Sequence, residues 1–196
     1  DISPFVPVLS HFKEPITLDM EVKGTVDQLN CSHLEIVSEE QQFRLRGDVS
    51  LQDLSHPQDA YVYGTLSELS ANTRGVGFLV RNLNPDYNGV PPILERLGNI
   101  SFRGEISGYF TDLVTYGQLR TSLGNVKTDL KLSADKSKGL FAYSGAVKTT
   151  DFKLGELLAN EQLGEITFNL DVHGRHITNQ RPTVELKGLI ASIDYS

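Results

Sequence analysis

The sequence predicts an all-β fold with one or two short helices, in the form of a curved, U-shaped open β-groove built of repeated strands. Three observations support this prediction. Apolar and polar residues alternate with period two over long stretches, a glycine cassette recurs on the apolar side, and clusters of turn-forming residues separate the stretches. The alternative is a β-sandwich, in which the same apolar face packs against a second sheet.

Composition and charge narrow the class of protein. The 196 residues are 39% hydrophobic and include 17 glycines, as in ordinary globular proteins. The net charge of −7 comes without a basic cluster, which argues against nucleic-acid binding. No apolar run approaches the roughly 20 residues that cross a bilayer. Because the chain opens at Asp1 without a methionine, we expect a single fragment, 1–196, of a longer protein.

The first 25 residues predict a connector followed by a strand. Pro4, Pro7 and Pro15 remove ladder donors, so residues 1–15 favour an edge or extended segment. Apolar residues then alternate with polar ones from Ile16 onward, which begins the first strand. The single cysteine, Cys31, excludes an internal disulfide, and we interpret it as a small buried residue.

A five-residue cassette, apolar–any–glycine–any–apolar, recurs along the chain. By parity its glycine falls on the apolar face, where a missing side chain is typical of a bend, a bulge or a close backbone approach. Two spacings, 41 and 43 residues, are about twice the first, 23 residues, which suggests hairpin units of about 20 residues and their doublets. The cassette glycines are Gly24, Gly47, Gly104, Gly145 and Gly188.

Residues 80–99 interrupt the alternation. Their prolines, asparagines and glycines predict a surface loop and a seam between two sub-repeats. Inside this segment, the string PPILERLG predicts one helical turn, with proline at its start and Gly98 at its end.

The C-terminal third predicts a second short helix and a last strand. Leu154, Leu157 and Leu158 recur at spacings of three and four, so a helix within residues 150–164 is expected, either capping the β core or docking a partner. Residues 175–182 form a polar connector, and the last strand runs from Thr183 to about Tyr195.

The sequence offers no catalytic constellation, so we expect neither an enzyme nor a cofactor or metal. It has no nucleophile elbow, no phosphate-binding loop and no dinucleotide-binding glycine pattern. His173 and His176 flank a strand-end glycine without a third ligand. The string Arg46-Gly47-Asp48 lies inside an alternating strand, which argues against an exposed recognition motif.

Residues 100–174 carry the clearest alternation and four distinctive short sequence strings. The strings are GQLRTSLG at 117–124, YSG at 143–145, DFKLGELLAN at 151–160 and LGEI at 163–166. Together they resemble segments of TamB-type translocation and assembly modules, of the AsmA-like group, above all those of the Bacteroidetes. The resemblance covers residues 93–174, and only general repeat character extends upstream.

This resemblance implies a β-taco fold in the periplasm of a Gram-negative envelope, with an inner-membrane anchor outside this chain. It also implies roles in outer-membrane biogenesis and phospholipid transport, with lipid acyl chains and outer-membrane assembly proteins (BamA/TamA-like) as partners. The alternative function is a β-sandwich ligand-binding or adhesion module with its ligand at residues 84–92. The third candidate function is a solenoid enzyme that cleaves polysaccharide. Such an enzyme needs two carboxyl groups that meet across a cleft, and the sequence shows no such pair.

The residues expected to line a lipid groove follow from parity within the resembling stretch. Their alternative role is a closed core, because parity assigns a face without saying what covers it. The fourteen are Ile100, Phe102, Ile106, Phe110, Val126, Leu130, Leu132, Phe141, Tyr143, Val147, Ile166, Phe168, Leu170 and Val172.

Overall fold

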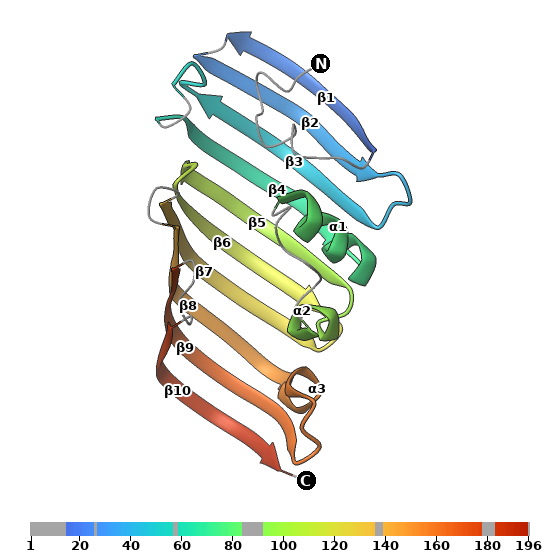
Figure 1. Cartoon of the computed structure of the whole chain (residues 1–196), viewed down its shortest axis with the longest axis vertical. Helices are drawn as coiled ribbons and strands as arrows, with labels where there is room; N and C mark the ends of the chain where they lie inside the picture. The colour runs from blue at the N-terminus through green and yellow to red at the C-terminus, as the bar shows by residue number, and fades with distance from the viewer. Residues whose placement is uncertain are drawn as a thin grey trace.

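A computed structural model describes residues 15–25, 27–56, 59–83, 92–135, 139–177 and 183–195. In these residues ten strands form one antiparallel sheet, and each strand pairs with its neighbours in sequence (Figure 1). The strands are β1 (Ile16–Thr25), β2 (Gln28–Ser38), β3 (Phe43–Gln52), β4 (Tyr61–Ala71), β5 (Ile100–Tyr109), β6 (Asp112–Thr121), β7 (Gly124–Asp135), β8 (Leu140–Lys153), β9 (Leu163–Ile177) and β10 (Thr183–Tyr195).

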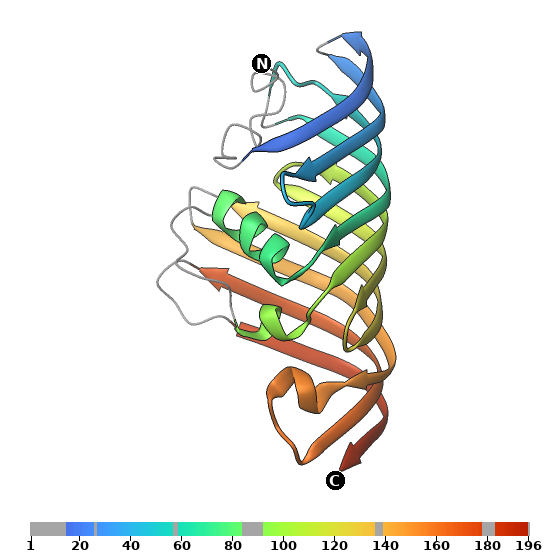
Figure 2. The same ribbon diagram turned by 90° about the vertical axis from the view of Figure 1, so that its right-hand side faces the viewer.

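Three short helices accompany the sheet. Helices α1 (Thr73–Leu83) and α2 (Pro92–Arg96) lie between β4 and β5, and α3 (Leu154–Leu158) lies between β8 and β9. The sheet is curved, and all three helices lie on its concave side (Figures 1 and 2). They lie near one set of strand ends, where the chain passes from β4 to β5 and from β8 to β9, and we call this set of ends the helix rim. The other set of strand ends, where β5 turns into β6 and β7 into β8, is the turn rim.

The all-β prediction and the open sheet are confirmed. The β-sandwich alternative is wrong for the described residues, because all ten of their strands belong to one sheet and no second sheet faces it. The sheet also continues through the expected seam, since β4 pairs with β5 from Tyr61–Tyr109 to Ala71–Ile100 on either side of the inserted helices.

The strand register gathers apolar side chains on one face. For example, Ile106 lies opposite Thr115, and the same row continues through Leu130, Gly145 and Val172. Because residues directly opposite each other point to the same side, this row and its neighbours form a single apolar face across the sheet. It is the concave face, since α1 and α3 pack against it.

The cassette glycines lie on this apolar face, as predicted. Gly104 is directly opposite Gly117, and a Cβ on Gly104 would overlap the carbonyl oxygen of Tyr116. The ring of Phe102 lies over both glycines, filling the space that their side chains would take. Gly145 has a φ of +141°, which side chains rarely adopt. The close approach of β6 therefore requires glycine at Gly104, and the backbone conformation requires it at Gly145.

The predicted repeat length is only partly right. The 23 residues from Gly24 to Gly47 span one hairpin, from β1 to β3. The 41 residues from Gly104 to Gly145 run from β5 to β8, and the 43 from Gly145 to Gly188 span one hairpin lengthened by α3. The longer spacings are therefore not doublets of the first, because the 41 residues cover three strand-to-strand steps and the 43 residues cover two steps lengthened by α3.

Helix α2 confirms the turn predicted from PPILERLG, and α3 is a five-residue helix inside the predicted 150–164. Helix α1 was not predicted, and its last four residues, 80–83, fall in the segment assigned to a loop. Its start is capped by Asn72, whose side-chain oxygen accepts a hydrogen bond from the backbone N–H of Gly75 (2.9 Å). Two glycines in the helix weaken its helical propensity and obscure the pattern.

Other predicted segments differ in extent or are not described. Strand β9 reaches Ile177, so the polar connector begins later than residue 175. Most of the predicted N-terminal connector, at residues 1–14, and loop residues 84–91 lie outside the described residues.

We expect Gly104→Ala to lower the free energy of unfolding by about 2 kcal/mol or more, because the added methyl group meets the backbone of the adjacent strand. Gly64→Ala, on the same face of β4, is the matched control, since its nearest neighbour is a Val49 methyl group at 3.2 Å that can shift. Urea denaturation of both variants measures the difference. Equal losses would contradict the proposed close approach.

Candidate functional site

The apolar face is divided into a covered half at the helix rim and an open half toward the turn rim. In the covered half, α1 packs Val76 and Phe78 against Phe43 and Ala71, and all four side chains are buried. The rings of Phe43 and Phe78 stack with centroids 6.0 Å apart. Strands β2 to β5 therefore gain a local hydrophobic core from a helix instead of from a second sheet.

A second cluster lies beneath α3. Its buried residues are Leu123, Phe152 and Ile166, and Leu154 and Leu157 of the helix pack against them. This cluster covers the helix-rim ends of β7, β8 and β9.

The backbone holds α3 closely over this cluster. A Cβ on Gly155 would overlap the carbonyl oxygen of Leu163, so this glycine lets the helix approach the start of β9. Arg96, at the end of α2, donates a hydrogen bond to the carbonyl oxygen of Leu157 (3.1 Å), which links α2 to α3. Short helices are weak alone, so these contacts determine where α3 lies.

The structure divides the fourteen expected lining residues between the two halves. Ile100 packs against the α1 cluster, and Val126, Ile166 and Phe168 belong to the α3 cluster. Phe102 lies at the boundary, over the glycines. Phe110 follows the end of β5, in the turn to β6, and is 41% exposed. The remaining eight, on the open half, are Ile106, Leu130, Leu132, Phe141, Tyr143, Val147, Leu170 and Val172.

None of these eight side chains is buried, and Phe141 is 44% exposed. No described segment of the chain lies over them as a second layer. Apolar side chains in this arrangement form a continuous surface that hydrocarbon can cover. The open half can therefore bind an apolar ligand without specific polar partners.

The apolar face also includes residues that the sequence did not single out. Leu113 and Leu119 of β6 pair with Leu132 and Val126 of β7 on this face. They were missed because β6 is apolar on both sides, with Val114 and Tyr116 exposed on the other face. Strand β10 adds Val184, Leu186 and Ile190, each more than half exposed.

On β2 to β4 the same face is closed, whereas Val22 of the edge strand β1, opposite Cys31, is 45% exposed. Cys31, Leu51, Val62 and Leu66 lie on β2 to β4 and are all buried. Burial also raises the pKa of the Cys31 thiol, in keeping with its interpretation as a small buried residue. The open surface is therefore concentrated on β5 to β10.

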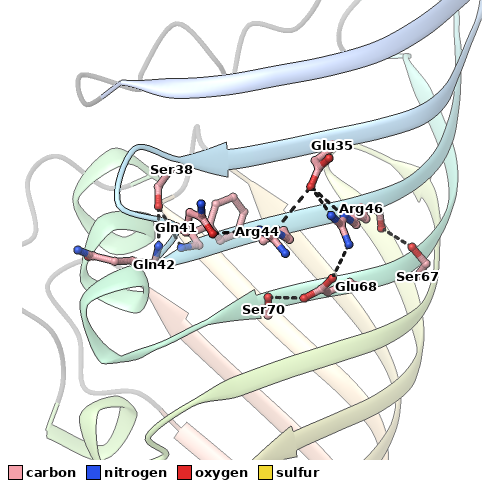
Figure 3. Close-up of polar contacts among 10 residues, drawn as sticks. Glu35, Ser38, Gln41, Gln42, Arg44, Arg46, Ser67, Glu68 and Ser70 are labelled. Atoms are coloured by element: carbon pink, nitrogen blue, oxygen red, sulfur yellow. Dashed lines mark hydrogen bonds and ion pairs between the residues drawn. The ribbon is translucent and has the colours of Figure 1, made fainter.

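The polar, outer face carries cross-strand ion pairs. Arg46 lies between Glu35 and Glu68 in the register, with nitrogen–oxygen distances of 2.7 and 3.6 Å (Figure 3). These side chains are substantially exposed, so each pair contributes at most about 1 kcal/mol. Because Arg46 and Asp48 lie in the middle of β3, the Arg-Gly-Asp string is not presented on a loop.

The described residues contain no group of three or more His, Cys, Asp or Glu side chains arranged to hold a metal ion. His173 and His176 lie on opposite faces of β9, since His173 is opposite Ser144 and His176 is opposite Phe141. In the described part of the chain, none of the helices has the length and apolar character of a membrane span. Comparison with protein-family models, curated proteins and solved structures gives no match.

Two phenylalanines of β8 test the division into covered and open halves. Phe152→Ala should cost about 3–5 kcal/mol in the free energy of unfolding, because Phe152 is buried under α3. Phe141→Ala should cost about 1 kcal/mol or less, because its side chain already contacts water. Urea denaturation gives both values. Similar losses would show that the open half is packed like a core.

Asp112, on the outer face at the turn rim, tests the electrostatics. It accepts a hydrogen bond from Ser133 Oγ (2.6 Å), and its other oxygen lies 2.9 Å from Lys131 Nζ; these partners hold the pKa of Asp112 below its usual value. The ionised carboxylate therefore adds stability above the pKa of the unfolded chain, and this contribution disappears as pH falls through the folded-state pKa.

In the Ser133→Ala variant, a carboxyl NMR titration should show the pKa of Asp112 moving up toward its ordinary value, since the Ser133 hydrogen bond is the largest cause of the shift. Ser144→Ala is the control, because Ser144 lies one strand further away and does not bond Asp112. An unchanged pKa in Ser133→Ala would contradict the assignment.

Proposed function

We propose that this chain is a segment of a TamB-type, AsmA-like protein, a U-shaped β-taco whose groove carries phospholipid acyl chains between the inner and outer membranes. The observation that carries this proposal is the open half of the apolar face on β5 to β10, where side chains remain accessible on the concave side of a single curved sheet (Figure 2). The sequence strings within residues 117–166 support the same assignment, because they resemble segments of TamB-type proteins.

The chemistry of the open half suits hydrocarbon. Strands β5 to β10 span about 24 Å at the usual spacing between strands, which gives room along the sheet for much of an acyl chain. Each methylene group removed from water gains about 0.8 kcal/mol, so even ten methylenes gain roughly 8 kcal/mol before ordering costs. Such a surface needs continuity and width, and it requires no catalytic group.

The resemblance supplies the cellular setting of the proposal. The full-length protein is anchored in the inner membrane by a segment outside this chain and extends through the periplasm. Its partners are outer-membrane assembly proteins of the BamA/TamA type, and its process is outer-membrane biogenesis. In this setting the chain acts as a binding surface and not as an enzyme.

Photocrosslinking to a phospholipid with a diazirine in its acyl chain tests the proposal. Leu170→Asp should reduce labelling of the chain at least about threefold, because an ionised carboxylate on the open half must lose water when hydrocarbon covers it. The matched control is Asn169→Asp, which adds the same charge to the adjacent, exposed position on the outer face.

Circular dichroism of both variants should show an intact β-sheet, since neither position is buried. Equal labelling of Leu170→Asp and the unmodified chain would rule out acyl-chain binding on this face. Equal loss in both variants would attribute labelling to charge alone and would also remove the proposal.

A further inference from the structure

The outer face has a hollow of its own near the turn rim. It spans β7 to β10, has a volume of about 650 Å³, and lies on the opposite side of the sheet from the apolar face. Its lining includes the polar side chains Lys131, Ser133, Ser144, His173, Arg175 and Glu185. Four adjacent strands thus bring basic and hydroxyl groups to one place.

The register explains how the groups converge. Ser144 lies directly opposite Lys131 on one side and His173 on the other, and Ala142 lies opposite Arg175. Residues opposite each other in antiparallel strands have Cα atoms about 4.5–5.5 Å apart. The small side chains of Ala142 and Ser144 therefore form a floor, and the longer basic side chains stand around it.

The charges of this hollow are only partly compensated. Lys131 is paired with Asp112 (2.9 Å), and Glu185 is paired with Lys187 (2.7 Å). None of the ion pairs formed between described residues involves the Arg175 guanidinium. In a chain with a net charge of −7, the hollow is thus a local site of positive charge.

We propose that this outer hollow binds a phosphoryl group. The planar guanidinium of Arg175 presents paired N–H donors that match two oxygens of a phosphate. His173 and Ser144 can donate from the neighbouring positions, and Lys131 adds a mobile charge on the far side. Donors from three strands suit a tetrahedral anion better than a planar carboxylate. The site does not depend on lipid binding to the apolar face.

NMR titration of the chain with inorganic phosphate tests this site. The amide signals of Ser144, His173 and Arg175 should shift saturably, and Arg175→Gln should weaken binding about tenfold through loss of a charge-assisted pair. Arg103→Gln is the matched control, because Arg103 is an exposed arginine on the outer face of β5, away from the hollow. It should leave the affinity unchanged.

Further ligands identify the source of the phosphoryl group. Glycerophosphoglycerol, a soluble phosphodiester headgroup, should bind more tightly than phosphate if the site receives lipid headgroups, and less tightly if it receives free phosphate. Acetate at equal ionic strength should bind at least about tenfold more weakly than either. Equal binding of acetate, equal weakening in Arg175→Gln and Arg103→Gln, or shifts that do not saturate would overturn the proposal.

Discussion

The hydrogen-bonded ladder between sequence-adjacent strands is the interaction on which the rest of this structure depends. Among the described residues no second sheet faces this one to form a two-layer core, so the continuity of the sheet rests on main-chain pairing from β1 to β10. The paired glycines of β5 and β6 allow close backbone approach without a steric clash. Where these contacts hold, the apolar side chains become aligned as one surface.

Burial on that surface has two distinct origins. At the helix rim, α1 and α3 cover it and create compact clusters around Phe43 and Phe152. Away from the helices, side chains such as Leu170 contact mainly their cross-strand neighbours and water. The buried clusters that stabilise the sheet and the side chains that remain accessible therefore lie on different halves of one face. Contact with the open half does not require the clusters under the helices to move.

Much of the fold was predictable because alternation and glycine placement are local properties of each strand. Helix α2 was recognisable from its initial proline, whereas α1 was hidden by Gly75 and Gly77 and by its overlap with turn-forming residues. Strand β6 concealed its inward face because Tyr116 makes the outward face apolar too. Core and open surface were inseparable in sequence, since Ile166 and Leu170 share one parity on β9 and differ only in whether the α3 cluster includes them.

The sequential strand order has a consequence for how such a protein can change in size. Each strand needs only its predecessor as a template, so pairing can propagate from either end, and contacts stay close along the chain, which favours rapid folding. Duplication or deletion of a hairpin would shift the remaining strands along the sheet without changing which of them pair with each other. A sheet of this kind can therefore become longer or shorter in evolution by one hairpin at a time.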